Sequence, residues 1–172
     1  MLETERLILR KLKEEDVTSI FNNWTNDPEV TKYLTWNHHT EISQTKEILV
    51  LWLEEEKQGT SYRWAIERKE DHVLMGMMDI VGFEEDAPKI GYVLGKAYWN
   101  NGYMTEAFSR VIQDLWDSGY QRIAIEAVDE NIGSNRVIQK CGFTYLSTER
   151  RLASVMKPIM VNVNKYELRR EE

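Results

Sequence analysis

The sequence has little cysteine, little histidine and no long hydrophobic run. A single cysteine, Cys141, among 172 residues excludes an internal disulfide and a metal site built from several cysteines. The three histidines have no acidic cluster at ligand spacing, so we expect no metal. The longest apolar run, residues 48–53, is too short to span a bilayer, and the first residues, MLETERLILR, lack the layout of a signal peptide. These absences predict a cytoplasmic protein with no membrane partner.

Basic residues are also in the minority: 22 Lys and Arg stand against 29 Asp and Glu, which gives a net charge of −7. A nucleic-acid-binding face needs a basic surface, so we expect no nucleic-acid partner. An acidic surface mildly favours a cationic substrate, although it also serves solubility. With 42% hydrophobic residues and no low-complexity tract, the chain is expected to form one domain, 1–172, that buries a core without disulfides.

Apolar periodicity and turn residues predict an alternation of strands and helices. Expected strands cover residues 6–12, 61–67, 73–83, 90–94, 122–128, 143–149 and 161–169. Expected helices cover residues 13–26, 41–57, a stretch from the turn at Gly102 to Gly119, and 134–140, with a further helical turn at 27–29. The charged turn at 69–72 makes a hairpin, and the helix after 90–94 implies one parallel pair. We therefore expect an α/β (or α+β) fold with a mixed, mostly antiparallel sheet of about seven strands flanked by helices.

The stretch from Lys89 to Gly119 contains a strand, a glycine-bearing turn and an amphipathic helix in succession. The turn is WNNGY, residues 99–103. A strand that leads through a tight turn into a helix gathers unpaired N–H groups and the positive end of the helix dipole at one point. Such a point binds phosphate or pyrophosphate. An ordinary strand-to-helix connection without a ligand is the alternative, because short phosphate motifs often occur by chance.

A second cluster, NIGSNRVIQKCGF at 131–143, follows the strand at 122–128. Asn131 can cap the helix or reach a ligand, and Ser134 can cap the helix or donate from its hydroxyl. Both clusters, with TERLILRKLKEEDV, NDPEVTKYL, YRWAIERK, GYVLGKAYWNNGYMTEA and NKYELRR, resemble the GNAT acetyl-CoA-dependent N-acetyltransferases over nearly the whole chain. The sequence is most similar to the branch that contains the ribosomal-protein alanine acetyltransferases RimJ and RimL.

This resemblance implies a GNAT fold with acetyl-CoA as co-substrate. In that family the strand matching 90–94 carries a bulge and splays from the strand matching 122–128, and the pantetheine arm lies in the gap like an extra strand. Main-chain groups of Tyr92 and Leu94 match the positions that contact the acetyl carbonyl and the pantetheine, and Asn131 matches an asparagine that hydrogen-bonds the arm. The residues assigned to the coenzyme A turn are Trp99, Asn100, Asn101, Gly102, Tyr103, Met104 and Thr105.

Four positions, Asn100, Met104, Ile138 and Pro88, depart from the family pattern. The family often has Gly in place of Asn100 and Gly or Ala in place of Met104, which is tolerable if the Met104 side chain points away from the phosphates. Many members have a tyrosine general acid where this chain has Ile138. In the RimL-like branch a serine takes that role, and Ser134 lies at its position. The resemblance therefore implies that Ser134 contacts the cofactor and gives a proton to its thiolate.

The general base is less well defined. The glutamate that some relatives use corresponds to Pro88, which leaves Asp79 and Glu126 as spare carboxylates, and we name Glu126 as the expected base. An α-amine with a pKa of about 8 needs less help than a lysine with a pKa of about 10.4. We expect direct attack of the neutral amine in a ternary complex. An acyl-enzyme on Cys141 is disfavoured, because that position suits a small core residue.

The expected function is transfer of the acetyl group of acetyl-CoA to a primary amine. The acceptor is a protein N-terminus, as in the RimL-like branch, or a small cationic amine such as a polyamine or an aminoglycoside. Residues 16–56 and the final hairpin are expected to shape its pocket. A non-catalytic acetyl-CoA-binding regulatory module and a plain interaction domain are the alternatives. An exposed last strand at 161–169 also suggests a homodimer.

Overall fold

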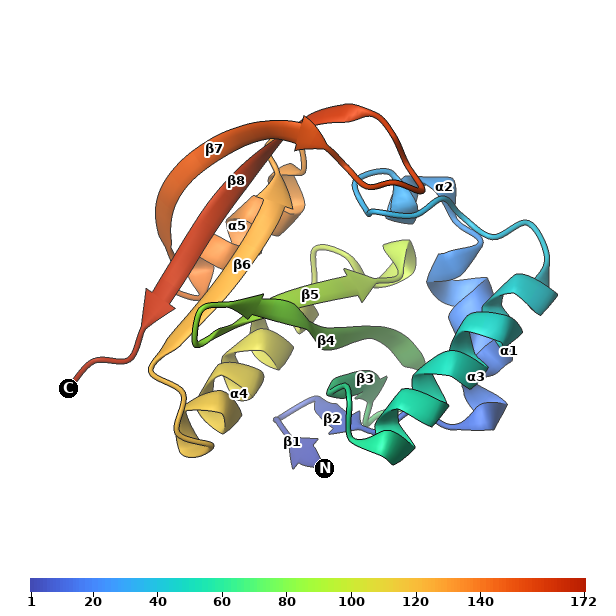
Figure 1. Cartoon of the computed structure of the whole chain (residues 1–172). Coiled ribbons are helices and arrows are strands. Elements are labelled where there is room, and N and C mark those ends of the chain that lie inside the picture. Colours follow the sequence, from blue (N-terminus) through green and yellow to red (C-terminus); the bar gives the residue numbers. More distant parts are fainter.

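Eight strands pair into one sheet in the order β1-β2-β3-β4-β5-β6-β8-β7 in the computed structural model, which describes residues 1–172 (Figure 1). All neighbours are antiparallel except β5 and β6, which are parallel. The predicted fold class is confirmed. One more strand is present than expected, because the two-residue β1 pairs with β2. The strands are β1 Leu2–Glu3, β2 Leu7–Arg10, β3 Arg63–Arg68, β4 Leu74–Glu84, β5 Ala87–Leu94, β6 Arg122–Val128, β7 Thr144–Leu152 and β8 Met160–Arg169.

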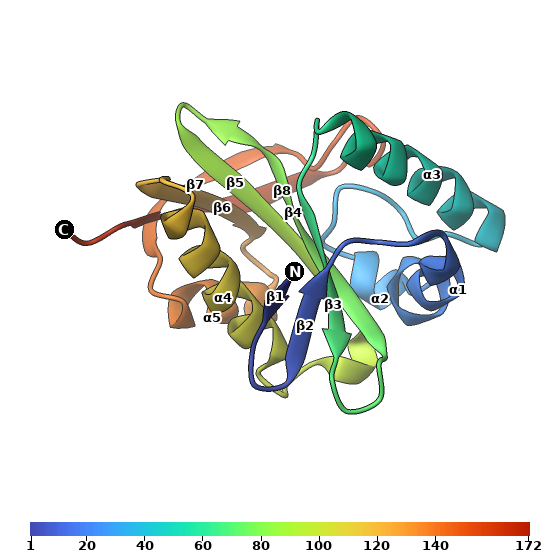
Figure 2. The same ribbon diagram turned by 90° about the horizontal axis from the view of Figure 1, so that it is seen from below.

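Helices cover both faces of this sheet, with α4 and α5 on one side and α1, α2 and α3 on the other (Figure 2). The α-helices are α1 Val17–Ile20, α2 Pro28–Thr31, α3 Ile42–Gln58, α4 Tyr103–Asp117 and α5 Ile132–Lys140. The helix predicted at 13–26 is one helical segment of three types: a 3-10 turn at Glu14–Asp16, then α1, then a π-helical turn at Phe21–Thr25. A second 3-10 turn, Lys96–Tyr98, follows β5. None of these helices has the length and hydrophobicity that crossing a bilayer requires.

Each face of the sheet has its own hydrophobic core. Phe108 of α4 and Ile138 of α5 belong to the cluster on one face, and Trp24 and Leu49 belong to the cluster on the other. The central strand β4 contributes to both, which explains its nearly continuous apolar run LMGMM. The sheet is thus a rigid wall between two packed layers.

The parallel pair β5–β6 opens almost as soon as it forms. The strands are in register only at Lys89↔Ala124 and Ile90↔Ile125. The Gly95 N–H donates to the Met75 carbonyl at 2.8 Å, so by strand alternation the main-chain groups of Tyr92 and Leu94 turn away from β4 and toward the gap. The predicted splay is therefore present, and it exposes one edge of β5.

Two expectations about the sheet are wrong. The bulge does not lie on 90–94: the register shifts between Ile80 and Gly82, so the unpaired residue is Val81 of β4, next to a glycine that lets the strand bend. The last strand is not an exposed edge either. β8 lies between β6 and β7, so the edge of the sheet is β7, and the reason given for a homodimer through the last strand does not hold.

A buried polar network fixes α5 to the sheet. Asn135 is 8% exposed, and its Oδ1 accepts from Tyr166 at 2.6 Å and from Asn164 at 3.0 Å. Its Nδ2 donates to the carbonyls of Asn131 at 2.8 Å and of Val128 at 3.0 Å. Because the side chains of Asn135, Asn164 and Tyr166 are buried, their hydrogen bonds set the position of the first turn of α5.

Replacing Asn135 with alanine is expected to lower the free energy of unfolding by about 2–4 kcal/mol, because it leaves the Tyr166 hydroxyl buried without a partner and removes one of the two acceptors of the Asn164 amide, which keeps Asp129. Urea unfolding followed by circular dichroism measures this. Gln139→Ala, an exposed change on the same helix, is the control and should stay within about 0.5 kcal/mol of the wild type. Equal stability of the two variants would contradict the role given to the network.

Candidate active site

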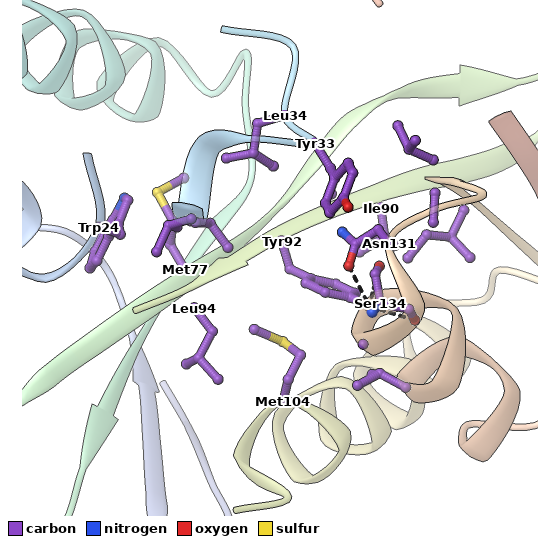
Figure 3. A pocket seen from close by; sticks show the side chains of 18 of the residues that line it. Trp24, Tyr33, Leu34, Met77, Ile90, Tyr92, Leu94, Met104, Asn131 and Ser134 are labelled. Atoms are coloured by element: carbon purple, nitrogen blue, oxygen red, sulfur yellow. Dashed lines mark hydrogen bonds between the residues drawn. The ribbon is translucent and has the colours of Figure 1, made fainter. Parts of the chain in front are cut away.

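A cavity of about 1200 Å³ runs through the gap between β5 and β6 (Figure 3). Its walls come from β4, β5, β6, the first turns of α4 and α5, and the segment around α2. The sequence-predicted site residues that line it are Tyr92, Leu94, Trp99, Asn100, Gly102, Tyr103, Met104, Thr105, Glu126, Asn131 and Ser134. Asn101 is the exception. Its amide donates to the carbonyls of Trp99 at 2.8 Å and Tyr98 at 3.3 Å, so its side chain supports the turn from outside the cavity.

The turn ends at a helix N-terminus whose N–H groups have no side-chain cap. Gly102 is the residue before the first turn of α4, with a φ of 77°. Asn100 has a φ of 60°, a left-handed conformation that asparagine tolerates and that explains why the family often has glycine there. Met104 is 4% exposed and points toward Tyr92 and Leu94, where it forms part of the cavity wall (Figure 3). The uncapped N–H groups make this end of the cavity suitable for an anion.

Two basic side chains that the motifs did not single out face the same cavity. Arg136 and Lys140 line it, four residues apart on α5, and neither forms an ion pair in the structure. Side chains at this spacing lie on one face of a helix, so the sequence did contain a signal for them. Together with the start of α4, they give one end of the cavity a positive character.

The free edge of β5 offers main-chain groups to a ligand. Those of Tyr92 face the gap beyond the last β5–β6 pair. At Leu94 the carbonyl accepts from the Trp99 indole N–H at 2.8 Å, so a ligand at Leu94 would use the N–H. An arm with amide groups can pair along such an edge in the manner of an added strand.

The start of α5 brings Asn131 and Ser134 to the opposite wall. Asn131 is the N-cap: its Oδ1 accepts from the Ser134 N–H at 3.2 Å, while its amide nitrogen has no partner in the protein. The alternative that Ser134 serves as the cap is therefore wrong. The Ser134 hydroxyl instead lies 2.9 Å from the Tyr92 hydroxyl, whose single proton has the Ser134 carbonyl, 3.2 Å away, as its alternative acceptor. Figure 3 shows this contact across the cavity wall.

Glu126, the expected base, is held by two cations. It pairs with Lys89 at 3.0 Å and with Arg151. Burial alone would raise the pKa of Glu126, but the hydrogen bonds from Arg151 and Lys89 outweigh burial and hold it below its ordinary value. The role of Glu126 as a base stays a prediction. The two ion pairs weigh against it, because they lower the affinity of the carboxylate for a proton.

Asp79 of β4 has the opposite environment. Burial raises its pKa to about 6, and Arg63, with its Nε 3.8 Å away, opposes the rise. Its cross-strand partner is Gly91, and a Cβ there would come within 3.3 Å of Asp79 Oδ1. The glycine therefore leaves the carboxylate open to the cavity that Asp79 lines. A carboxylate with a pKa near neutrality can accept a proton from an amine.

The family tyrosine and glutamate have no counterpart at their expected places. Ile138 is fully buried in the core between α5 and the sheet, and Pro88 pairs with Phe83 at the β4–β5 turn. Cys141 is partly buried, and burial raises the pKa of its thiol, which suits a packing role. Tyr92, Ser134 and Asp79 remain as polar side chains that line the cavity.

Comparison with known proteins identifies the family. Residues 6–144 match the family model described as an acetyltransferase (GNAT) domain. The uncharacterized N-acetyltransferase YoaA of Bacillus subtilis (strain 168) is 35% identical over 151 residues, which cover 83% of this chain and 82% of YoaA.

Solved structures share the fold. The microcin C7 self-immunity acetyltransferase MccE, in complex with acetyl-CoA and AMP, has a TM-score of 0.86 at 19% identity and covers 97% of this chain and 94% of that chain. RimL, a ribosomal L7/L12 alpha-N-protein acetyltransferase in complex with coenzyme A, has a TM-score of 0.83 at 19% identity, over 96% and 95% of the two chains.

Gly102→Val is expected to weaken acetyl-CoA binding at least about tenfold, because a branched side chain strains the left-handed turn and blocks close approach to the α4 N-terminus. Calorimetry measures the dissociation constant. Gly119→Val is the matched control, since Gly119 also has a positive φ, 97°, and open surroundings, but lies at the other end of α4. Unchanged affinity in Gly102→Val would remove the phosphate site from this turn.

Proposed function

This chain belongs to the GNAT acetyltransferase family, and from that premise we propose that it transfers the acetyl group of acetyl-CoA to a primary amine. One observation carries the proposal: a single cavity joins the uncapped start of α4, the free edge of β5 and the Ser134 hydroxyl. These groups fit coenzyme A in order, from its pyrophosphate through its amide-bearing arm to its sulfur. Arg136 and Lys140 add charge for its phosphates.

The cofactor supplies an acetyl thioester, whose carbonyl carbon takes the amine nitrogen as the carbon–sulfur bond breaks. The Tyr92 or Leu94 N–H can stabilise the negative charge that develops on the carbonyl oxygen. Ser134 gives a proton to the departing sulfur. Asp79 takes a proton from the amine. The protein's further contribution is to hold both substrates in one cavity, which supplies much of the rate of a direct transfer.

The acceptor we propose is the α-amine of a protein or peptide, or another amine with one positive charge. The acceptor end of the cavity has mainly apolar walls, among them Trp24, Tyr33, Leu34, Trp36 and Met77. Of the carboxylates that line the cavity, Glu29 pairs with Lys96 at 2.6 Å and Glu126 pairs with Lys89 and Arg151, which leaves Asp79. A polyamine or an aminoglycoside would bring several charges into this end with Asp79 as the one carboxylate left to meet them, which costs desolvation energy. The lining therefore disfavours small polycations.

Release of the coenzyme A thiol from acetyl-CoA tests the proposal, with a panel of amines: peptides with varied N-termini, spermidine, an aminoglycoside and free amino acids. We expect amine-dependent release, fastest with peptides that have an apolar first residue. Acetyl-CoA binding by calorimetry without release on any amine would favour the regulatory module. Absence of binding would leave only the interaction domain and would overturn the proposal.

If Asp79 is the base, kcat/KM with a peptide acceptor should fall as the pH drops through about 6, because the protonated carboxyl no longer accepts a proton. This fall in kcat/KM near pH 6, the lower limb of the pH profile, adds to the fall below about pH 8 that protonation of the α-amine itself causes. Asp79→Asn should remove the lower limb and reduce kcat by about 10²-fold or more.

Two further variants sharpen this pH test. Asp117→Asn, an exposed change near the end of α4, should leave the profile unchanged. Glu126→Gln should keep the limb near pH 6. If that limb disappears in Glu126→Gln and persists in Asp79→Asn, the base is Glu126 and the assignment of Asp79 is wrong.

Asp79→Asn should also stabilise the fold at pH 7. A carboxyl whose folded pKa, about 6, lies above its unfolded value contributes stability that is present at low pH and is lost as the pH rises between the two values. The neutral amide avoids that loss. We therefore expect a higher melting temperature for the variant at pH 7 than for the wild type, and a smaller difference at pH 4.

A further inference from the structure

Two hydroxyl groups from opposite walls of the cavity meet at the start of α5. The Tyr92 hydroxyl comes from β5 and the Ser134 hydroxyl from α5, and their oxygens are 2.9 Å apart (Figure 3). At the position where many family members have the tyrosine acid, this chain has Ile138, which lies one turn further along α5 and is buried in the core. The chain thus has a tyrosine hydroxyl beside the expected proton donor, supplied by a different element of the fold.

We propose that Tyr92 is a positioning residue that relays its proton through Ser134 to the departing sulfur. The inference rests on the proposed acetyltransferase function and names a further participant in it. As the carbon–sulfur bond breaks, the Ser134 proton moves to sulfur and the Tyr92 proton moves to Ser134 Oγ. The proton that Asp79 takes from the amine returns through water to the tyrosinate, so that no proton is gained or lost.

The contacts of Tyr92 favour this direction of transfer. Its hydroxyl has two acceptors, Ser134 Oγ at 2.9 Å and the Ser134 carbonyl at 3.2 Å. The Ser134 carbonyl also belongs to the helical hydrogen-bond pattern of α5, in which backbone carbonyls accept from N–H groups one turn later. Ser134 Oγ is therefore the nearer acceptor, and it has no such second donor. When Tyr92 donates to Oγ, the hydroxyl proton of Ser134 is left to point into the cavity.

Acidity gives a reason for a tyrosine behind the serine. A thiol has an ordinary pKa of about 8.5 and a phenol of about 10, whereas an aliphatic hydroxyl is a far weaker acid than either. A serine that gave its proton alone would become a strongly basic alkoxide. A serine that receives a proton as it gives one leaves the charge on the phenol, which is a far better match to a thiolate. Burial raises the pKa of Tyr92 above this ordinary value, which keeps the phenol protonated before the reaction and makes the phenol a weaker acid than a free one, though still a stronger acid than the serine hydroxyl.

Both members of the pair are held in place. The Tyr92 ring packs edge-on against Phe108, with centroids 5.8 Å apart, and Phe108 stacks on Phe143. On the other side, Asn131 caps the first turn of α5 at Ser134. Because neither hydroxyl has to be reoriented from solvent, the contact is preorganised, as a proton donor in a site requires.

The test compares Tyr92→Phe, Ser134→Ala and the double variant in the release of the coenzyme A thiol. Tyr92→Phe keeps the ring and removes only the hydroxyl. We expect it to lower kcat by about 10–100-fold while the KM for acetyl-CoA changes less than about threefold. In a relay the double variant is no slower than Ser134→Ala alone, because both changes break the same chain.

Tyr145→Phe is the matched control. Tyr145 makes a similar hydroxyl pair with Thr148, 2.7 Å apart, but it lies on the exposed strand β7 outside the cavity. This variant should keep the kcat of the wild type. Wild-type kcat in Tyr92→Phe, or single effects that multiply in the double variant, would overturn the relay.

A second readout needs no turnover. The ultraviolet absorbance of the thiolate gives the pKa of the coenzyme A thiol when coenzyme A is bound. A hydroxyl relay aimed at sulfur stabilises the thiolate, so the thiol pKa should be lower in the wild type than in Tyr92→Phe or Ser134→Ala. Equal values in all three proteins would contradict the relay. A wild type without amine-dependent release would instead contradict the proposed function and leave this measurement to decide the hydroxyl contact.

Discussion

The parting of β5 and β6 is the constraint on which the rest of the site depends. Two strands at the centre of a sheet normally satisfy one another's main-chain groups, and groups left without partners in a protein interior are costly. Here the pairing ends after Ile90 and Ile125, so the edge of β5 at Tyr92 and Leu94 faces a cavity instead of a neighbour. A ligand that carries amide groups restores the missing partners. The fold thus favours an arm-like cofactor in this place.

The charges around that gap divide the cavity into two ends. The overall charge of −7 suggests a cationic substrate, yet the cavity does not follow the average of the chain. Its cofactor end gathers Arg136, Lys140 and the positive end of the α4 dipole. Its other end has mainly apolar walls, where Glu29 pairs with Lys96 and Asp79 is left open to the cavity. Local charge, not net charge, is what a substrate meets, so the structure gives a more selective account of the acceptor than composition does.

Local features of the structure were largely predictable from the sequence. The three- and four-residue spacing of apolar residues in α4, the glycine turn before it and the hairpin at β3–β4 depend on neighbours along the chain, and all three are present. The position of β8 inside the sheet and the bulge at Val81 were missed. Lateral strand order and register depend on long-range pairing, which periodicity does not encode.

The same contrast between local sequence features and long-range contacts applies to the candidate site. The turn proposed to bind coenzyme A could be suggested from the sequence because it is one continuous motif. The contact between Tyr92 and Ser134 joins residues 42 positions apart, and the raised pKa of Asp79 depends on burial by other strands. No local pattern contains either. From the sequence, Glu126 and Asp79 were both spare carboxylates and Glu126 was named as the base; the ion pairs of Glu126 and the burial of Asp79 are found only in three dimensions.

A crystal structure of the protein with coenzyme A tests the central claim most directly. The account predicts that the pyrophosphate lies on the N–H groups at the start of α4, that the pantetheine arm pairs with β5 at Tyr92 in the gap beside β6, and that the sulfur lies within hydrogen-bond reach of the Ser134 hydroxyl. Coenzyme A bound elsewhere, or an arm outside the β5–β6 gap, would contradict it.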